Sequence, residues 1–242
     1  MLEYIDFIKK NTLDLEIYFS SSVLDGLTLD KITELKTSLD YNPSLSIHAP
    51  FMDLSPGAVD SKVRTATLER FSHVLDISEI LKPKAIVLHS GYEKWKYAMN
   101  VDLWLEMSLI TWKQVNKRAS DIGVKIAIEN IFEDEPSNLQ LLMKSMDSKN
   151  FGICFDTGHF NLFSKVPLKE WMDSLNQFII ELHLHDNDKS FDQHLSVGEG
   201  TFDFKEFFGM LSNKNCIHTI EAHTPENVMK CMERIKKLTA NI

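Results

Sequence analysis

Short runs of apolar residues recur along the chain, and each is followed by a polar loop and a segment with helical periodicity. The runs are 5 to 7 residues long and rich in Ile, Leu, Val and Phe. They lie at 15–19, 45–49, 85–89, 125–129, 152–156, 179–185 and 218–222. Continuous apolar runs of this length, rather than alternating ones, predict strands that are buried on both faces of a parallel sheet.

The segments between these runs have the spacing of amphipathic helices. In 101–119, apolar or small residues return every three or four positions, which predicts a helix with one face on the core. Gly123 follows at the place where a left-handed backbone ends many helices. Thr224–Pro225 predicts a helix start, because proline at the first helical position loses no hydrogen bond. Alternating strands and helices predict a parallel sheet, since parallel strands need long crossover connections.

Seven strands with helices between and after them predict a TIM (β/α) barrel, which we expect to form a single domain over residues 1–242. An open doubly wound sheet would carry a Gly-rich first turn. The one GxG sequence, Gly198-Glu199-Gly200, comes late and does not follow a strand directly. It predicts a turn, with phosphate binding as the second interpretation.

The front of the chain departs from a standard barrel, which has eight strands. Residues Leu2 to Asn11 have helical periodicity, and Lys9 and Lys10 suit a last helical turn. We therefore expect an incomplete barrel with seven strands, because the first strand is missing. The strands at 15–19 and 218–222 would then flank a gap. Unpaired strand edges need a cover, which side chains, the N-terminal helix or a second subunit could supply, so a homodimer is one expected arrangement.

Composition and charge exclude several classes of protein. Of the 242 residues, 43% are hydrophobic and 25% charged, as in ordinary soluble globular proteins. The net charge of −9 disfavours nucleic acid as a partner, because nucleic-acid binders are usually basic. No apolar run approaches the roughly 18 residues of a membrane span, and the N-terminus lacks a signal-like apolar region. Three cysteines without a CxxC pair disfavour a disulfide framework, so we expect a cytoplasmic protein.

Side chains that bind metals end successive strands of the predicted barrel. They are His48, His89, Glu129, Asp156, His183 with His185, and Glu221. The carboxyl ends of barrel strands meet at one mouth, where active sites lie. Clustered carboxylates without a Lys or Arg repel one another in a dry mouth unless a cation lies between them. The pattern favours a divalent-metal site over the alternative, a set of hydrogen-bonded barrel residues.

Two local motifs extend this pattern. The segment CFDTGH (154–159) places Asp156 at a strand end and His159 about one helical turn later. Asp192 and His194 form an Asp-x-His pair, which puts both side chains on one side of an extended loop. Together with His159 they predict a second metal site.

Four further residues are candidates for substrate contact: His48, His185, Asp186 and His223. Asp186 also has a structural interpretation, because it begins a run of turn-forming residues. His223 lies two residues past Glu221 and shares its face, so that it either lines the pocket or has a structural role.

The motifs together resemble the xylose-isomerase-like TIM barrels. That superfamily contains sugar isomerases and epimerases and the abasic-site nuclease endonuclease IV. The resemblance covers nearly the whole chain from about residue 13. The segments that carry it are HAP (48–50), LHSG (88–91), AIEN (127–130), CFDTGH (154–159), HLHDND (183–188), DQHLSVGEG (192–200) and IEAH (220–223).

The resemblance implies a set of metal ligands. Those that match the one-metal site of the epimerases are Glu129, Asp156, His183 and Glu221. Those that match further ligands in the endonuclease IV pattern are His89, His159, Asp192 and His194. The nuclease also uses a histidine about ten residues beyond the HAP position, where this chain has Ala58 nearby. We therefore expect one to three divalent ions, with zinc or manganese favoured and magnesium or cobalt as alternatives.

Three functions are consistent with these residues. The first is an isomerase or epimerase acting on a small sugar or sugar phosphate through a metal-stabilised enediolate, with Glu129 and Glu221 as the catalytic acid and base. The second is an endonuclease IV-like phosphodiesterase, favoured by His159, Asp192 and His194 and opposed by the acidic charge. The third is a non-catalytic binding protein on a decayed barrel, which the nearly complete ligand set opposes.

Overall fold

The computed structural model describes residues 4–240. Its seven parallel strands follow one another in the sheet in the order of the sequence, so the fold is an α/β fold of the TIM-barrel type, as predicted. The strands are β1 (Leu15–Tyr18), β2 (Leu45–His48), β3 (Ala85–His89), β4 (Lys125–Glu129), β5 (Phe151–Asp156), β6 (Ile179–Leu184) and β7 (Ile217–Ile220). The helices are α1 (Ile5–Lys10), α2 (Ser21–Asp25), α3 (Leu29–Ser38), α4 (Ser61–Leu81), α5 (Val101–Asp121), α6 (Ser137–Met146), α7 (Thr157–Phe163), α8 (Leu168–Leu175), α9 (Phe204–Met210) and α10 (Pro225–Thr239), with a 3₁₀ turn at Asn176–Phe178.

The first regular element of the described chain is a helix rather than a strand. Helix α1 covers Ile5–Lys10, and its last turn carries Lys9 and Lys10, whose charge suits the carbonyl end of a helix. The first strand begins only at Leu15. The expectation of a seven-stranded sheet is therefore confirmed; Leu2, where the predicted helix begins, lies outside the described residues.

Two compact units divide the chain. Within the described residues, the first comprises residues 4–128 and 141–152, and the second residues 129–140 and 153–240. The expectation that residues 1–242 form a single domain stays a prediction.

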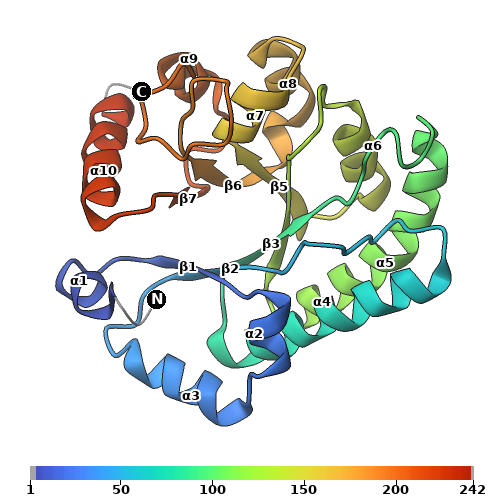
Figure 1. The fold of residues 1–242 in the computed structure, drawn as a ribbon, viewed down its shortest axis with the longest axis horizontal. Coiled ribbons are helices and arrows are strands. Elements are labelled where there is room, and N and C mark those ends of the chain that lie inside the picture. Colours follow the sequence, from blue (N-terminus) through green and yellow to red (C-terminus); the bar gives the residue numbers. More distant parts are fainter. Residues whose placement is uncertain (1–3, 241–242) are drawn as a thin grey trace. The chain divides into compact units, whose positions relative to one another are not determined.

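The first unit is built on aromatic packing between its two long helices, which run side by side (Figure 1). Trp104 and Trp112 of α5 are fully buried, and Phe71 of α4 stacks on Trp112 with ring centroids 5.5 Å apart. These tryptophans lie on the stripe that the periodicity of 101–119 predicted. Helix α5 ends at Asp121, and Gly123 takes the expected left-handed backbone, with φ of 75°.

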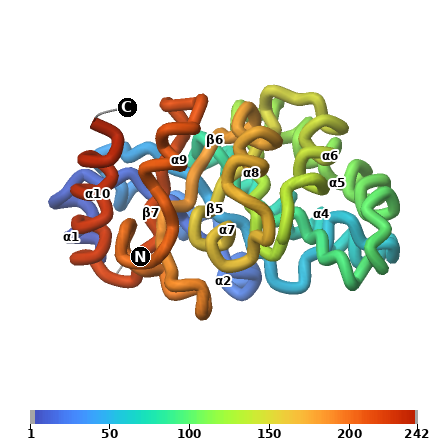
Figure 2. Tube along the Cα trace, turned by 90° about the horizontal axis from the view of Figure 1, so that it is seen from above, coloured from blue at the N-terminus to red at the C-terminus, as the bar shows by residue number. Residues whose placement is uncertain are grey.

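The second unit places the ends of its strands in register. Strands β5, β6 and β7 pair in parallel, with Asp156 opposite His183 and Leu184 opposite Ile220. Phe155 packs away from Asp156, against Trp171 and Phe207, because successive side chains of a strand point to opposite faces. Helix α10 lies beside α9 and β7 (Figure 2). One face of β5 thus packs on the helices, and the other presents the polar strand end.

No cross-link or membrane span contributes to this fold in the part of the chain that the structure describes. Cys154, Cys216 and Cys231 are free thiols. None of the described helices combines the length and the apolar character that crossing a bilayer requires.

Close packing at Gly57 gives a test of the first unit. A Cβ atom at Gly57 would lie 2.4 Å from Ser108 Oγ and 2.5 Å from Trp104 Cδ1. We expect Gly57→Ala to lower the free energy of unfolding by about 1–3 kcal/mol, because both neighbours are buried and cannot move aside. Urea denaturation measures this difference. Gly26→Ala is the matched control, since its nearest neighbour is 4.0 Å away, and an equal loss in both variants would contradict the packing explanation.

Candidate metal centre

Three carboxylates of the second unit surround one atom, Nδ1 of His183. Glu221 Oε1 lies 3.2 Å from it, Glu129 Oε1 3.3 Å and Asp156 Oδ2 3.7 Å. His183 and Asp156 are fully buried, Glu129 is 2% exposed, and the Glu221 side chain is 21% exposed. The structure thus brings together the four residues that match the one-metal site of the epimerases.

Local hydrogen bonds explain how these strand ends are held. The Asn130 side chain brackets the backbone of Asp156: its Oδ1 accepts from Asp156 N at 2.9 Å, and its Nδ2 donates to Asp156 O at 3.0 Å. Asp156 caps helix α7, because its Oδ1 accepts from His159 N at 2.7 Å. The cap turns His159 back toward the strand ends.

The donor set fits a divalent cation. Ligands about 2.0–2.1 Å from a tetrahedral metal lie roughly 3.3 Å from one another, which is close to the spacing around His183 Nδ1. Asp156 and Glu221 make ion-pair contacts only with histidines among the described residues. Burial raises the pKa of Glu221, and the Asp156 and Glu129 carboxylates add to this effect against the opposing pull of His183 and His185. A cation between these carboxylates would remove their mutual repulsion.

A second cluster surrounds Asp192. His194 Nε2 lies 3.0 Å and His159 Nε2 3.4 Å from Asp192 Oδ2, and His185 Nδ1 lies 3.6 Å from Asp192 Oδ1. The structure therefore brings together His159, Asp192 and His194, the residues of the expected second site. It adds His185, whose ring stacks on that of His194 with centroids 4.1 Å apart.

The charges of this cluster are strongly coupled. Burial opposes ionisation of His159, but Asp156, Asp192 and Glu129 together raise its pKa to about 12. Burial likewise opposes ionisation of Asp192, yet hydrogen bonds from His159 and His194 hold its pKa well below the usual range. The pKa of Asp156 is also lowered, because His159 and His185 outweigh its complete burial. The cluster is thus arranged to carry positive charge between its carboxylates.

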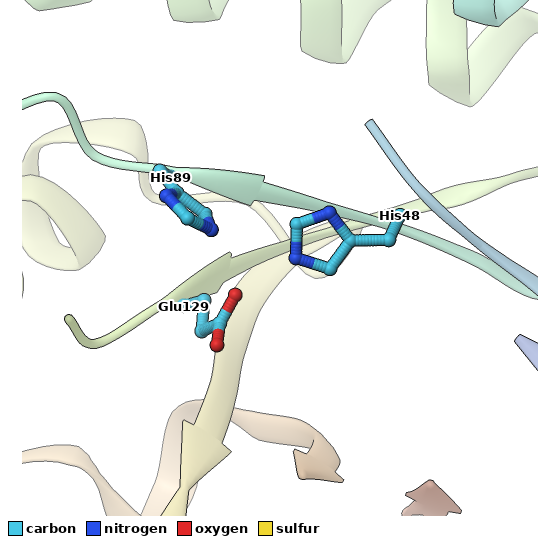
Figure 3. A group of neighbouring side chains, drawn as sticks. All are labelled: His48, His89 and Glu129. Carbon is cyan, nitrogen blue, oxygen red and sulfur yellow. The ribbon is translucent and has the colours of Figure 1, made fainter. Parts of the chain in front are cut away.

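His48 and His89 lie together in the first unit. They stand at the ends of β2 and β3, with ring centroids 5.2 Å apart (Figure 3). Phe51 stacks on His89 at 4.3 Å, and Tyr18 packs edge-on against His48 at 5.6 Å. His48 Nδ1 also lies 2.8 Å from the carbonyl oxygen of Ala49, which orients the ring. Aromatic packing therefore fixes both imidazoles.

Asp186 is committed to the loop that follows β6. Its fully buried carboxylate accepts hydrogen bonds from the backbone N–H groups of Asn187, Gly198, Gly200 and Phe202 at 2.9–3.1 Å. Its backbone also pairs with Leu195, next to His194. These bonds give Asp186 a structural role in the loop, and its role in substrate contact stays a prediction. They also show that the amides of Gly198 and Gly200 face an internal carboxylate, which supports the turn interpretation over phosphate binding.

The sequence analysis did not predict roles for two residues of the site, Asn130 and Gly158. Asn130 directly follows Glu129, and Gly158 lies within the CFDTGH motif, so the signal available for both was their position beside candidate ligands. A Cβ atom at Gly158 would lie 2.0 Å from His185 Cε1, which makes glycine necessary there.

His223 is exposed, with its ring centroid 5.2 Å from that of His194.

Comparison with known proteins identifies the family of this fold. A family model described as xylose isomerase-like TIM barrel matches residues 14–238. The chain belongs to this family. Two proteins of Methanocaldococcus jannaschii, both described as uncharacterised, are similar members of known sequence. MJ1311 is 30% identical over 206 residues, which are 81% of this chain and 70% of that protein. MJ1614 is 27% identical over 212 residues, which are 84% of this chain and 81% of that protein.

Solved structures similar to this xylose isomerase-like barrel include a D-tagatose 3-epimerase-like protein. It is 29% identical, with a TM-score of 0.80 over 92% of this chain and 86% of the other. The TTHB071 protein of Thermus thermophilus, studied after soaking with ZnCl₂, has a TM-score of 0.82 and 23% identity over 100% of this chain and 94% of the other. At that identity the second likeness shows the fold alone.

The carboxylate of Asp186 gives a test of how the loop carrying Asp192 and His194 is held. We expect Asp186→Asn to destabilise the protein by about 1–3 kcal/mol, because the amide NH₂ would face backbone donors in a buried site. Hydrogen exchange should show faster exchange of the Gly198, Gly200 and Phe202 amides. Asp188→Asn, at an exposed turn of the same loop, is the control. Unchanged protection of these three amides in the Asp186 variant would contradict this role.

Proposed function

We propose that the protein is a divalent-metal-dependent isomerase or epimerase of a sugar or sugar phosphate. The observation that carries this proposal is the gathering of three carboxylates, those of Glu129, Asp156 and Glu221, around Nδ1 of His183 in the second unit. Family membership supports it, as does the likeness to a D-tagatose 3-epimerase-like structure.

The two glutamates are the proposed acid and base. A divalent cation held by the four side chains would polarise a substrate carbonyl and acidify the neighbouring C–H group. In this proposal Glu129, at the end of β4, and Glu221, directly after β7, reach the bound carbon from different sides. One carboxylate removes the α proton to give an enediolate, and the other returns a proton to the opposite face. This exchange inverts the carbon, as an epimerase requires.

The surrounding histidines are proposed to bind and orient the substrate. In the second unit, the exposed His223 beside His194 is available to substrate hydroxyls.

Proton exchange tests the role of the glutamates. The protein, loaded with Mn²⁺, is incubated in D₂O with D-fructose, D-tagatose and a panel of other ketoses and ketose phosphates, and NMR follows loss of the α C–H signal. We expect exchange with at least one compound, lowered by about 10²–10⁴ in Glu129→Gln and in Glu221→Gln. Glu226→Gln, on the exposed first turn of α10, should match the unmodified protein. Exchange that survives in both Glu129 and Glu221 variants would refute the assignment.

A second candidate function is a metal-dependent phosphodiesterase of the abasic-endonuclease type. The cluster around Asp192 favours it, since in-line phosphate displacement commonly uses two or more ions. We expect His194→Ala to lower the number of bound ions by one, measured by elemental analysis after Zn²⁺ loading and dialysis. An unchanged count would remove the second site. Cleavage of an abasic-site duplex that His194→Ala abolishes would favour the phosphodiesterase over the epimerase.

A further inference from the structure

Two buried atoms lack hydrogen-bond partners next to the first candidate metal site, the one formed by Glu129, Asp156, His183 and Glu221. They are Nδ1 of His185 and Oδ1 of Asp192, which lie 3.6 Å apart. The other ring nitrogen of His185, Nε2, lies 3.1 Å from the Asp156 carboxylate. An ionised carboxylate only accepts hydrogen bonds, so Nε2 carries the hydrogen, and in the neutral ring Nδ1 then has a lone pair. In this neutral form two acceptor atoms face each other in a buried place, and either a cation between them or a second proton on the His185 ring removes the cost.

The other two imidazoles of the cluster, those of His159 and His194, also direct one ring nitrogen toward Asp192. His159 turns Nδ1 toward the carbonyl oxygen of Asn130 at 3.1 Å, and its Nε2 toward Asp192. His194 turns Nδ1 toward Glu221 Oε2 at 3.5 Å, and its Nε2 toward Asp192. Each ring therefore points one nitrogen at an outer acceptor and the other at the same carboxylate. Metal-bound histidines are oriented in this way, with the outer N–H donated to a carboxylate or a carbonyl.

We propose that His185 is a metal ligand through Nδ1. It completes a four-ligand cation site with His159, Asp192 and His194, and its Nε2–H on Asp156 links this site to the first. The inference rests on the proposed function in so far as Asp156 binds the first ion. Three imidazoles and one carboxylate are a typical donor set for Zn²⁺, whereas the carboxylate-rich first site suits Mn²⁺ or Mg²⁺. The two sites should therefore differ in metal preference.

The packing around His185 holds its ring in the required orientation. Its side chain is fully buried, it stacks on His194, and Gly158 leaves the space that the ring occupies. The Thr157 hydroxyl also donates to the His185 carbonyl oxygen at 2.8 Å. The residue thus has little freedom to turn Nδ1 elsewhere, as expected of a preorganised ligand.

Co²⁺ titration of the metal-free full chain tests this proposal, with the bound ions counted by elemental analysis and the visible absorption of Co²⁺ reporting each site. We expect two ions in the unmodified protein. His185→Gln retains an amide near the Nε2 position for Asp156 but has no atom at the Nδ1 position. It should bind the first ion as before and the second about 100-fold more weakly or not at all. His185→Asn returns an oxygen near the Nδ1 position and should recover part of the second affinity.

Each outcome of this titration is decisive. Two ions bound by His185→Gln with unchanged affinities and spectrum would overturn the proposal. One ion in the unmodified protein would also overturn it, with His185 then acting as a charged partner of Asp192, but would leave the proposed function standing. No bound ion at all would contradict both.

Gly158→Ala provides a second variant that leaves the His185 side chain chemically intact. Its Cβ atom would displace the ring, so we expect the same loss of the second ion. Gly209→Ala in α9 is the matched control, because nothing lies within 4 Å of its Cβ position. Circular dichroism checks that both variants fold. A folded Gly158→Ala protein that binds the second ion with unchanged affinity would argue against His185 as a ligand.

Discussion

Buried negative charge at the ends of β4 to β7 is the constraint on which the second unit depends. Glu129, Asp156 and Glu221 gather around one imidazole nitrogen, and Asp192 lies on the far side of His185. Removing carboxylates from water is costly unless positive charge accompanies them. The cluster offers only imidazoles for Asp156 and Glu221, and these would each need an extra proton to supply that charge. Divalent cations supply it without protonating the ligands.

The surrounding structure is organised to maintain this arrangement. The parallel register of β5 and β6 sets Asp156 beside His183, and the aromatic packing behind Phe155 holds the strand that carries Asp156. Asp186 gathers four backbone amides and so fixes the loop that presents Asp192 and His194. The functional side chains thus stand on strands and on a tightly bonded loop, as precise metal geometry requires.

Much of this architecture follows from the sequence. The apolar runs predicted the seven strands, because burial on both faces demands continuous apolar residues, and the helical spacing before Leu15 predicted the helix found at Ile5–Lys10. The sequence also predicted that four side chains lie close together, because parallel strand ends meet at one edge; they are Glu129, Asp156, His183 and Glu221. Their role as metal ligands stays a prediction.

Other features depend on contacts distant in sequence. Asp186 occurs in a run that reads as a simple turn, and its partners lie up to 16 residues away, so its part in holding the loop could not be read from local spacing. His185 lies two residues after His183, just beyond the end of β6, and its expected contact with substrate stays a prediction. The contacts of its two ring nitrogens, with Asp156 and toward Asp192, suggest its proposed role as a ligand, and sequence spacing alone does not reveal them.

Anomalous diffraction from a crystal soaked in MnCl₂ tests the central claim most directly. We expect a manganese peak bound by Glu129, Asp156, His183 and Glu221, with ligand atoms about 2.0–2.3 Å from the ion. A well-ordered site without such a peak, or with two or more of these side chains turned away from the ion, would contradict the claim.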